Sequence, residues 1–168
     1  QALCAAARAS SDDGAPLDGA TQCSEAPVEA LPLVAECTKQ TLRAPEGVSE
    51  LDYEGLQWTN VDLTVEATAP LLIVMKAPKL RAVAVHLTGP VVLHVQDAQV
   101  SDLRVFGAGS PAGEPSLSLL SVEATQLRVG DLERPFQGVV HVRSSKLRVI
   151  ELHLNELDPG LAAHVGDD

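Results

Sequence analysis

Aromatic side chains are scarce in this chain of 168 residues, where one Trp, one Tyr and two Phe make up 2%. Sugar-binding grooves and platforms for single-stranded nucleic acid are usually walled with aromatic rings, so the composition argues against both. Basic residues are also few, with 12 Lys and Arg against 23 Asp and Glu and a net charge of −11. This acidic balance argues against a partner with a phosphate backbone. The longest run of large apolar side chains, residues 71–75, is far shorter than the ~20 residues of a membrane-spanning helix. We expect no nucleic-acid partner and no membrane span.

Cysteine is limited to three residues, Cys4, Cys23 and Cys37, and none of their spacings is the Cys-x-x-Cys of zinc or redox sites. We predict one disulfide, Cys23–Cys37, that staples the N-terminal segment in an oxidising compartment. The protein would then be secreted or belong to the cell envelope. The alternative is three unpaired thiols in a cytoplasmic protein. The sequence indicates no metal and no cofactor.

Composition divides the chain into three parts. Residues 1–31 are rich in Ala, Ser, Asp, Gly and Pro, which is typical of a linker or capping segment. Residues 32–158 consist of short apolar runs broken by Pro and Gly, and residues 159–168 form an acidic tail.

The middle part repeats. One apolar position recurs at Leu42, Val61, Leu80, Val100, Leu127 and Leu147, and another five residues earlier at Cys37, Leu56, Met75, Val95, Val122 and Val142. The step is close to 20 residues except for 27 between Val100 and Leu127, which indicates a Gly- and Pro-rich loop insertion at 107–115.

Short strands repeating at this period cannot bury themselves singly, but stacked copies bury a continuous core. The sequence therefore predicts an all-β chain that forms a single parallel β-solenoid of about six coils. A leucine-rich repeat is the alternative, because residues 147–157 fit its pattern, but the Asn of that pattern is missing from the other units.

Within a coil, apolar residues recur at every fifth position, as at Val95, Val100 and Val105. This spacing resembles the pentapeptide-repeat proteins, whose motif is small–polar–Leu–x–x. It is best matched by residues 98–100, 125–127 and 145–147. The resemblance implies a right-handed parallel β-helix over residues 32–158.

The two ends of a solenoid expose strand edges, which invites end-to-end association. Residues 1–55 carry 3 basic and 10 acidic groups, and residues 151–168 carry no basic and 5 acidic groups. The residues between them are near neutral. We expect the two acidic ends to cap the solenoid and to repel the ends of other copies. A variant of this expectation is a solenoid whose uncapped ends associate end to end.

Two surfaces are candidate binding sites. Basic residues beside the recurring apolar position predict a stripe for an acidic glycan, a carboxylate-bearing polymer or an acidic protein face: Lys79, Arg81, Arg128, Lys146 and Arg148. The 107–115 loop, with Phe106 at its root and Ser110 within it, is the second candidate, because loops on rigid scaffolds often carry recognition. Trp58 would either plug the first full coil or contact a partner.

Little in the arrangement of the acidic and histidine residues indicates a catalytic site. Glycan-cleaving solenoids need carboxylates clustered across adjacent coils, whereas Asp97 aligns with Ala124 and Ser144. His94 and His141 lie two coils apart, too far for a shared metal.

We therefore expect a non-enzymatic structural or binding module of the cell envelope or exterior that presents a flat wall to a protein or acidic polymer. One alternative is an enzyme or lectin acting on an acidic polysaccharide, marked by a groove lined by Asp97, Asp102 and Arg104. Others are a self-assembling scaffold and an acidic DNA-mimicking inhibitor, although the near-neutral walls count against mimicry.

Overall fold

The computed structural model describes residues 24–28, 31–154 and 163–165, which form strands and connecting segments without a helix. Seven strands form sheet A, in spatial order β1 (Ser24–Val28), β2 (Val34–Leu42), β4 (Gln57–Glu66), β6 (Lys79–Thr88), β8 (Gln99–Ala108), β10 (Glu123–Val129) and β12 (Lys146–Leu152). Six form sheet B, in spatial order β13 (Ala163–Val165), β11 (Val139–Arg143), β9 (Ser116–Leu120), β7 (Val91–Gln96), β5 (Leu71–Lys76) and β3 (Glu50–Glu54).

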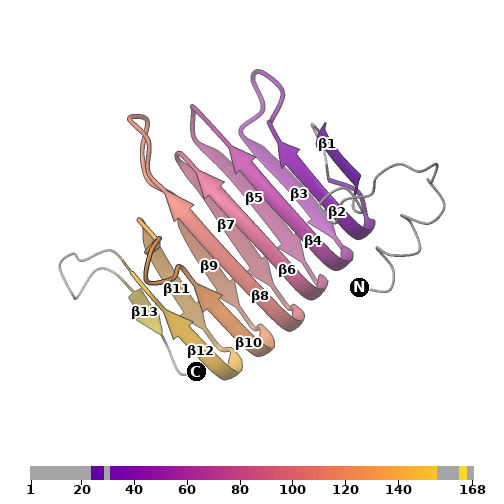
Figure 1. Ribbon diagram of the computed structural model, residues 1–168, viewed down its shortest axis with the longest axis vertical. Coiled ribbons are helices and arrows are strands. Elements are labelled where there is room, and N and C mark those ends of the chain that lie inside the picture. Colours follow the sequence, from indigo (N-terminus) through magenta and orange to yellow (C-terminus); the bar gives the residue numbers. More distant parts are fainter. Residues whose placement is uncertain (1–23, 29–30, 155–162, 166–168) are drawn as a thin grey trace.

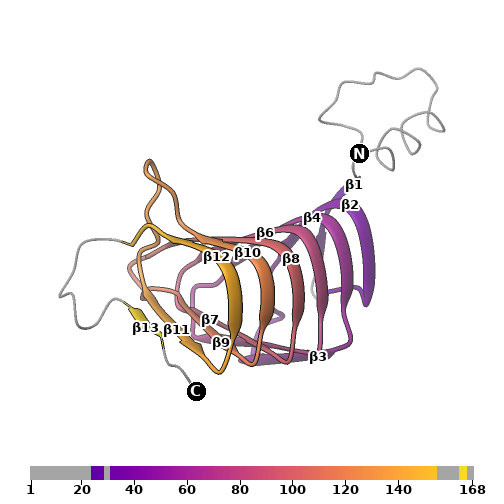
Figure 2. The same cartoon turned by 90° about the horizontal axis from the view of Figure 1, so that it is seen from below.

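From β2 onward the chain alternates between the two sheets, so each coil adds one parallel strand to each (Figure 1). Seen from below, the coils stack one on another, with β1 and β2 at one end and β12 and β13 at the other (Figure 2). This is the predicted parallel β-solenoid. It has about 5 turns, slightly fewer than the six expected, and the coil that begins with β12 does not close within the described range.

Inward-facing Val and Leu side chains of the two sheets form the core. On sheet A, Leu63, Val85, Val105 and Val129 occupy one register position on successive strands and are fully buried. On sheet B, Ile73, Leu93, Leu117 and Val140 do the same. Like residues at a spacing of about 4.8 Å pack without large rings, which explains the low aromatic content.

The register corrects the predicted alignment at both ends of the repeat. Trp58, not Val61, is the partner of Leu80, and Leu42 pairs with Val65. In the second column Tyr53, not Leu56, is the partner of Met75. The register partners Ala35, Trp58 and Leu80 are 23 and 22 residues apart, whereas the predicted step was 19.

The alignment is also corrected after the insertion. Ala124, not Leu127, is the partner of Val100 and Leu147, while Leu127 pairs with Leu103 and Ile150. The prediction for Leu127 was wrong by three residues because the extra residues divide between two loops. One follows β8 at 109–115, and the other follows β10 at 130–138.

Each coil turns from sheet B into sheet A through a residue with a left-handed backbone. These residues directly follow β3, β5, β7, β9 and β11, and their φ angles are 77° at Gly55, 52° at Ala77, 56° at Asp97, 56° at Ser121 and 51° at Ser144. The amide N–H donates to a carbonyl of the next coil in four of them, for example from Ala77 to Gln96 at 2.8 Å. The corners therefore stack and leave these amides satisfied.

Two aromatic rings fill irregular parts of the core. Trp58 is 1% exposed, and its Nε1 donates to the Pro32 carbonyl at 3.0 Å, so the interpretation of Trp58 as a plug is confirmed. Phe136 is fully buried against Gly107 and Gly138, where a Cβ would overlap its ring or the Pro115 carbonyl oxygen.

Both terminal segments contribute a strand. β1 falls within the residues expected to be a linker or cap and pairs with β2, and β13 falls within the tail and pairs with β11. Residues 24–28, 31–154 and 163–165 contain no helix that could span a membrane.

Candidate functional sites

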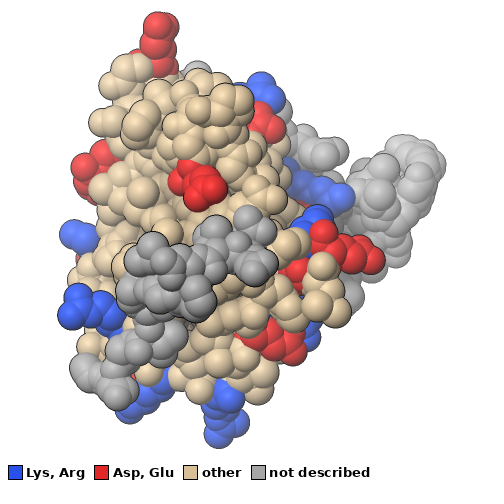
Figure 3. Space-filling model, turned by 90° about the vertical axis from the view of Figure 1, so that its left-hand side faces the viewer, with Lys and Arg blue, Asp and Glu red and all other residues tan. Residues whose placement is uncertain are grey.

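Loops from three coils line a groove of about 740 Å³ at one corner of the solenoid, which we call the loop groove. Its walls come from residues 43–48 after β2, residues 66–71 after β4, and residues 110–112 after β8, with Thr88 between them. Most of the lining side chains are small and apolar: Ala44, Pro45, Val48, Ala67, Ala69, Leu71, Pro111 and Ala112. Figure 3 views the side of the molecule toward which these loops lie, and much of that surface is uncharged.

Ser110 shapes one wall of the loop groove. Its backbone N–H donates to the Gly113 carbonyl at 2.8 Å, and Gly113 donates back at 2.9 Å. Its hydroxyl accepts from the Ala112 N–H at 3.1 Å. The predicted contact residue therefore holds the loop closed, and Pro111 and Ala112 are the residues that this loop offers to the groove.

The opposite rim is charged. Arg43 Nε donates to Glu66 Oε1 at 3.0 Å, and both side chains are largely exposed, at 67% and 46%. An exposed pair of this kind contributes at most about 1 kcal/mol to stability. The pair places one cation and one carboxylate beside a largely apolar groove, whose lining also includes the carboxylate of Glu46.

A second, more open groove of about 500 Å³ lies on the outer face of sheet A, and we call it the wall groove. Its polar lining comes from two adjacent register positions on β4, β6, β8 and β10: Gln57, Lys79, Gln99 and Glu123, and Thr59, Arg81, Ser101 and Thr125. Lys79 and Arg81 of the predicted basic stripe lie here together.

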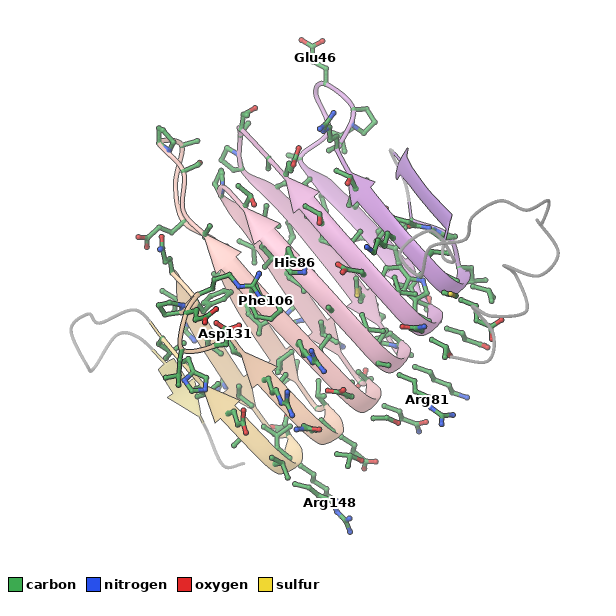
Figure 4. All side chains as sticks on the ribbon, viewed as in Figure 1. Glu46, Arg81, His86, Phe106, Asp131 and Arg148 are labelled. Carbon is green, nitrogen blue, oxygen red and sulfur yellow. The ribbon has the colours of Figure 1, made fainter. Side chains whose placement is uncertain are left out.

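The other basic residues of the stripe lie apart from this pair. Lys146 shares a register position with Lys79, but Gln99 and Glu123 stand between them. Arg148 projects from the same edge of the ribbon as Arg81, on the distant strand β12 (Figure 4). Arg128 sits at another register position, and its Nε lies 3.7 Å from Glu151 Oε1.

Phe106 takes part in a series of side-chain contacts on the outer face of sheet A. His86 and Phe106 are register neighbours whose rings stack at 4.8 Å, and the Arg134 guanidinium lies 4.6 Å from the Phe106 centroid. His86 Nε2 also lies 3.3 Å from Asp62 Oδ1. Figure 4 shows His86, Phe106 and Asp131 close together over β6 and β8.

Asp131 lies at the far end of that series of contacts. Its carboxylate accepts from the backbone N–H of Arg134 at 2.6 Å and of Glu133 at 3.0 Å. These bonds, with the Arg134 backbone bond first, lower the pKa of Asp131. An ionised Asp131 therefore closes the turn that carries Arg134.

Carboxylates gather at one other place on the wall. A groove of about 260 Å³ is lined by Lys39, Asp62, Asp102 and Arg104. A groove lined by Asp97, Asp102 and Arg104 was the predicted mark of a protein that acts on an acidic polysaccharide. Asp102 and Arg104 do line this groove, but Asp97 does not and lies instead at a corner of its coil. Within the ranges described above, no three His, Cys, Asp or Glu side chains are placed to share a metal ion.

The fold defines the class of this protein, a parallel β-solenoid. Comparison of the chain with protein-family models, with curated proteins and with solved structures found no match. The resemblance to pentapeptide-repeat proteins therefore gains no support from a relative.

Proposed function

We propose that this protein is a non-enzymatic binding module of the cell envelope or exterior, whose loop groove receives an apolar segment of a protein partner. One observation carries the proposal: three loops far apart in sequence together line about 740 Å³ of largely apolar space. Binding sites for small apolar groups typically have volumes of about 300–1,000 Å³.

The scaffold suits this role because its loops are fixed at both ends by sheet strands. The loop after β8 is further closed by the paired bonds between Ser110 and Gly113. Gly89, which follows the lining residue Thr88, donates its backbone N–H to the Ala108 carbonyl at 3.1 Å. A groove with little freedom to lose binds with a smaller entropic cost.

The lining also indicates the chemistry of the partner. The side chains of alanine and proline present a shallow aliphatic surface without polar atoms, which fits an aliphatic or aromatic side chain. The Arg43–Glu66 pair at the rim offers both charges to the backbone or flanking residues of a peptide.

Secretion is supported by the cysteines. Cys37 has no free thiol, and its partner lies outside the described residues. β1 begins at Ser24, directly after Cys23, and pairs with Thr38, directly after Cys37. This register supports the Cys23–Cys37 disulfide, which remains a proposal because Cys23 is not described.

The test is selection of peptides from a random displayed library against the full chain, followed by affinity measurement on two variants. Ala112→Trp fills the loop groove, and Leu132→Trp places the same ring on a loop outside it, where Leu132 is 86% exposed. We expect selected peptides to contain an apolar residue and to lose about tenfold or more in affinity only with Ala112→Trp. Peptides that bind both variants equally would contradict the proposal.

A second candidate function rests on the wall groove. Its two rows of polar side chains repeat at the strand spacing of about 4.8 Å, which suits an extended acidic polysaccharide lying along the solenoid axis. Polygalacturonate should bind wild type, and charge reversal at Lys79 and Arg81 should abolish that binding, whereas Lys146→Glu should not. Equal loss in both variants would indicate attraction by overall charge.

A further inference from the structure

Within the described residues, the two sheets end in four outer strands, β1 and β12 in sheet A and β3 and β13 in sheet B. An exposed outer strand can pair with a strand of another chain, and proteins commonly prevent this with proline, with charged side chains or with a very short strand. Three of the four strands have such a feature. β1 contains Pro27, β3 alternates the carboxylates Glu50, Asp52 and Glu54, and β13 has only three residues.

β12 is the exception. It has seven residues and no proline, and its outer edge pairs with no other strand in the part of the chain that the structure describes. Ile150 on β12 is 39% exposed, whereas Leu127 and Leu103, which precede it at the same register position on β10 and β8, are each 1% exposed. Val149 beside it is also exposed. The core of the solenoid is therefore open at β12, where one more strand would cover it.

The register of sheet A defines the apolar residues that such a strand needs. Leu147, Ile150 and Leu152 are the register partners of three buried residues of β10. A solenoid buries its core by stacking like residues at like positions of successive coils. The added strand should therefore place aliphatic residues opposite Leu147, Ile150 and Leu152.

The outward side chains of β12 define the charges. Lys146 and Arg148 are exposed at the start of the strand and Glu151 near its end. Opposite charges already adjoin on this wall, since Lys146 is the register partner of Glu123, and Arg128 Nε lies 3.7 Å from Glu151 Oε1. Opposite charges on neighbouring strands stabilise a sheet, and like charges weaken it. The added strand should carry acids opposite Lys146 and Arg148 and a base opposite Glu151.

We propose that the outer edge of β12 receives an extended segment of a protein partner as a further parallel strand of sheet A. The segment has the pattern acid, aliphatic, acid, any residue, aliphatic, base, aliphatic. This surface is separate from the loop groove, whose lining contains no residue of β12. A second copy stacked end to end fits less well, because its outer strand at the opposite end, β1, contains Pro27, which has no N–H to donate.

The probe is the synthetic peptide Glu-Val-Glu-Ser-Val-Lys-Val, titrated into the isotope-labelled full chain and followed by nuclear magnetic resonance. We expect the amide signals of β12 to move and its amides to gain protection from hydrogen exchange, while the amides of β6 stay unchanged. The charge-reversed peptide Lys-Val-Lys-Ser-Val-Glu-Val should bind about fivefold more weakly. Arg148→Glu should weaken binding of the first peptide by about fivefold and reduce this preference.

The matched control is Arg81→Glu, which makes the same charge change on the outer face of the interior strand β6. It should alter the affinity by less than about twofold. Ile150→Asp should abolish binding, because the peptide would cover an unpaired charge. Far-UV circular dichroism of each variant verifies that the solenoid is intact.

Three results would overturn the proposal. The first is that the β12 signals do not move, and the second is that Arg81→Glu weakens binding as much as Arg148→Glu, which would indicate attraction by overall charge. The third concerns the chain without peptide, which should sediment as a monomer. Dimers that form with rising concentration and disappear in Ile150→Asp would assign the edge to a second copy instead of a partner.

Discussion

Trp58 makes the sharpest stability prediction, because its ring fills the N-terminal part of the core. It is 1% exposed, its register partners are Ala35 and Leu80, and its indole N–H reaches the Pro32 carbonyl at 3.0 Å. Truncating a buried Trp to Ala costs about 3–5 kcal/mol, and losing the hydrogen bond adds about 1 kcal/mol. We expect Trp58→Ala to lower the free energy of unfolding by about 4–6 kcal/mol, a large part of the roughly 5–15 kcal/mol typical of a domain.

Urea unfolding followed by far-UV circular dichroism measures this cost, since the variant has no tryptophan fluorescence. Trp58→Phe keeps most of the ring but loses the indole N–H, so it should cost only about 1–2 kcal/mol. Leu132→Ala, at an 86% exposed position, should change stability by less than about 0.5 kcal/mol. A cost below about 1 kcal/mol for Trp58→Ala would refute the plug.

Three further predictions concern a corner, a disulfide and a loop. Gly138→Ala should destabilise the protein by about 1–3 kcal/mol because its Cβ meets buried atoms, whereas Gly109→Ala, which approaches only a flexible side chain, should be near neutral in the same urea assay. Peptide mapping of the unreduced chain should recover Cys23 joined to Cys37, and a different pairing would contradict the register argument. The pKa of Asp131 is lowered, so its contribution is full above the unfolded value of about 3.9 and is lost as the pH falls through the folded value. The protection of the amides in its loop, relative to their intrinsic exchange rate at the same pH, should therefore fall below about pH 4 and, at neutral pH, in Asp131→Asn.

The architecture could be predicted from the sequence because stacking needs like residues at like positions. The recurrence of Leu80 and Val100 at one position, and of Met75 and Val95 at another, predicted true register partners. Those pairs fix both the period and the parallel direction of the strands. Apolar spacing alone was enough to distinguish a solenoid from a helical fold.

The alignment after the insertion could not be predicted, because the corners carry no common residue type. A residue with a left-handed backbone is usually a glycine, as Gly55 is. The equivalent corners are Ala77, Asp97, Ser121 and Ser144, which are unremarkable in sequence. Without that marker, a second loop after β10 was indistinguishable from a longer first loop.

The candidate sites were predictable only where they lie within one segment. The 107–115 loop stood out by composition, and Ser110 does line the loop groove. The facing walls at 43–48 and 66–71 come from other coils, and nothing local in sequence relates them to that loop. The stripe likewise failed at Arg128, since the three-residue shift in register moved it to another column.

The two fully buried rings, Trp58 and Phe136, are each accommodated by small neighbours. Because adjacent strands are only about 4.8 Å apart, a buried ring packs most easily beside a small residue of a neighbouring coil. Trp58 has Ala35 as its register partner, and Phe136 packs against Gly107 and Gly138. Tyr53 lies on β3 at the edge of sheet B, with its hydroxyl accepting from the Leu31 N–H at 3.2 Å. Enlarging a compensating residue should therefore destabilise the protein as removing the ring does, although by less, so the small residues beside Trp58 and Phe136 are as much a part of the core as the rings themselves.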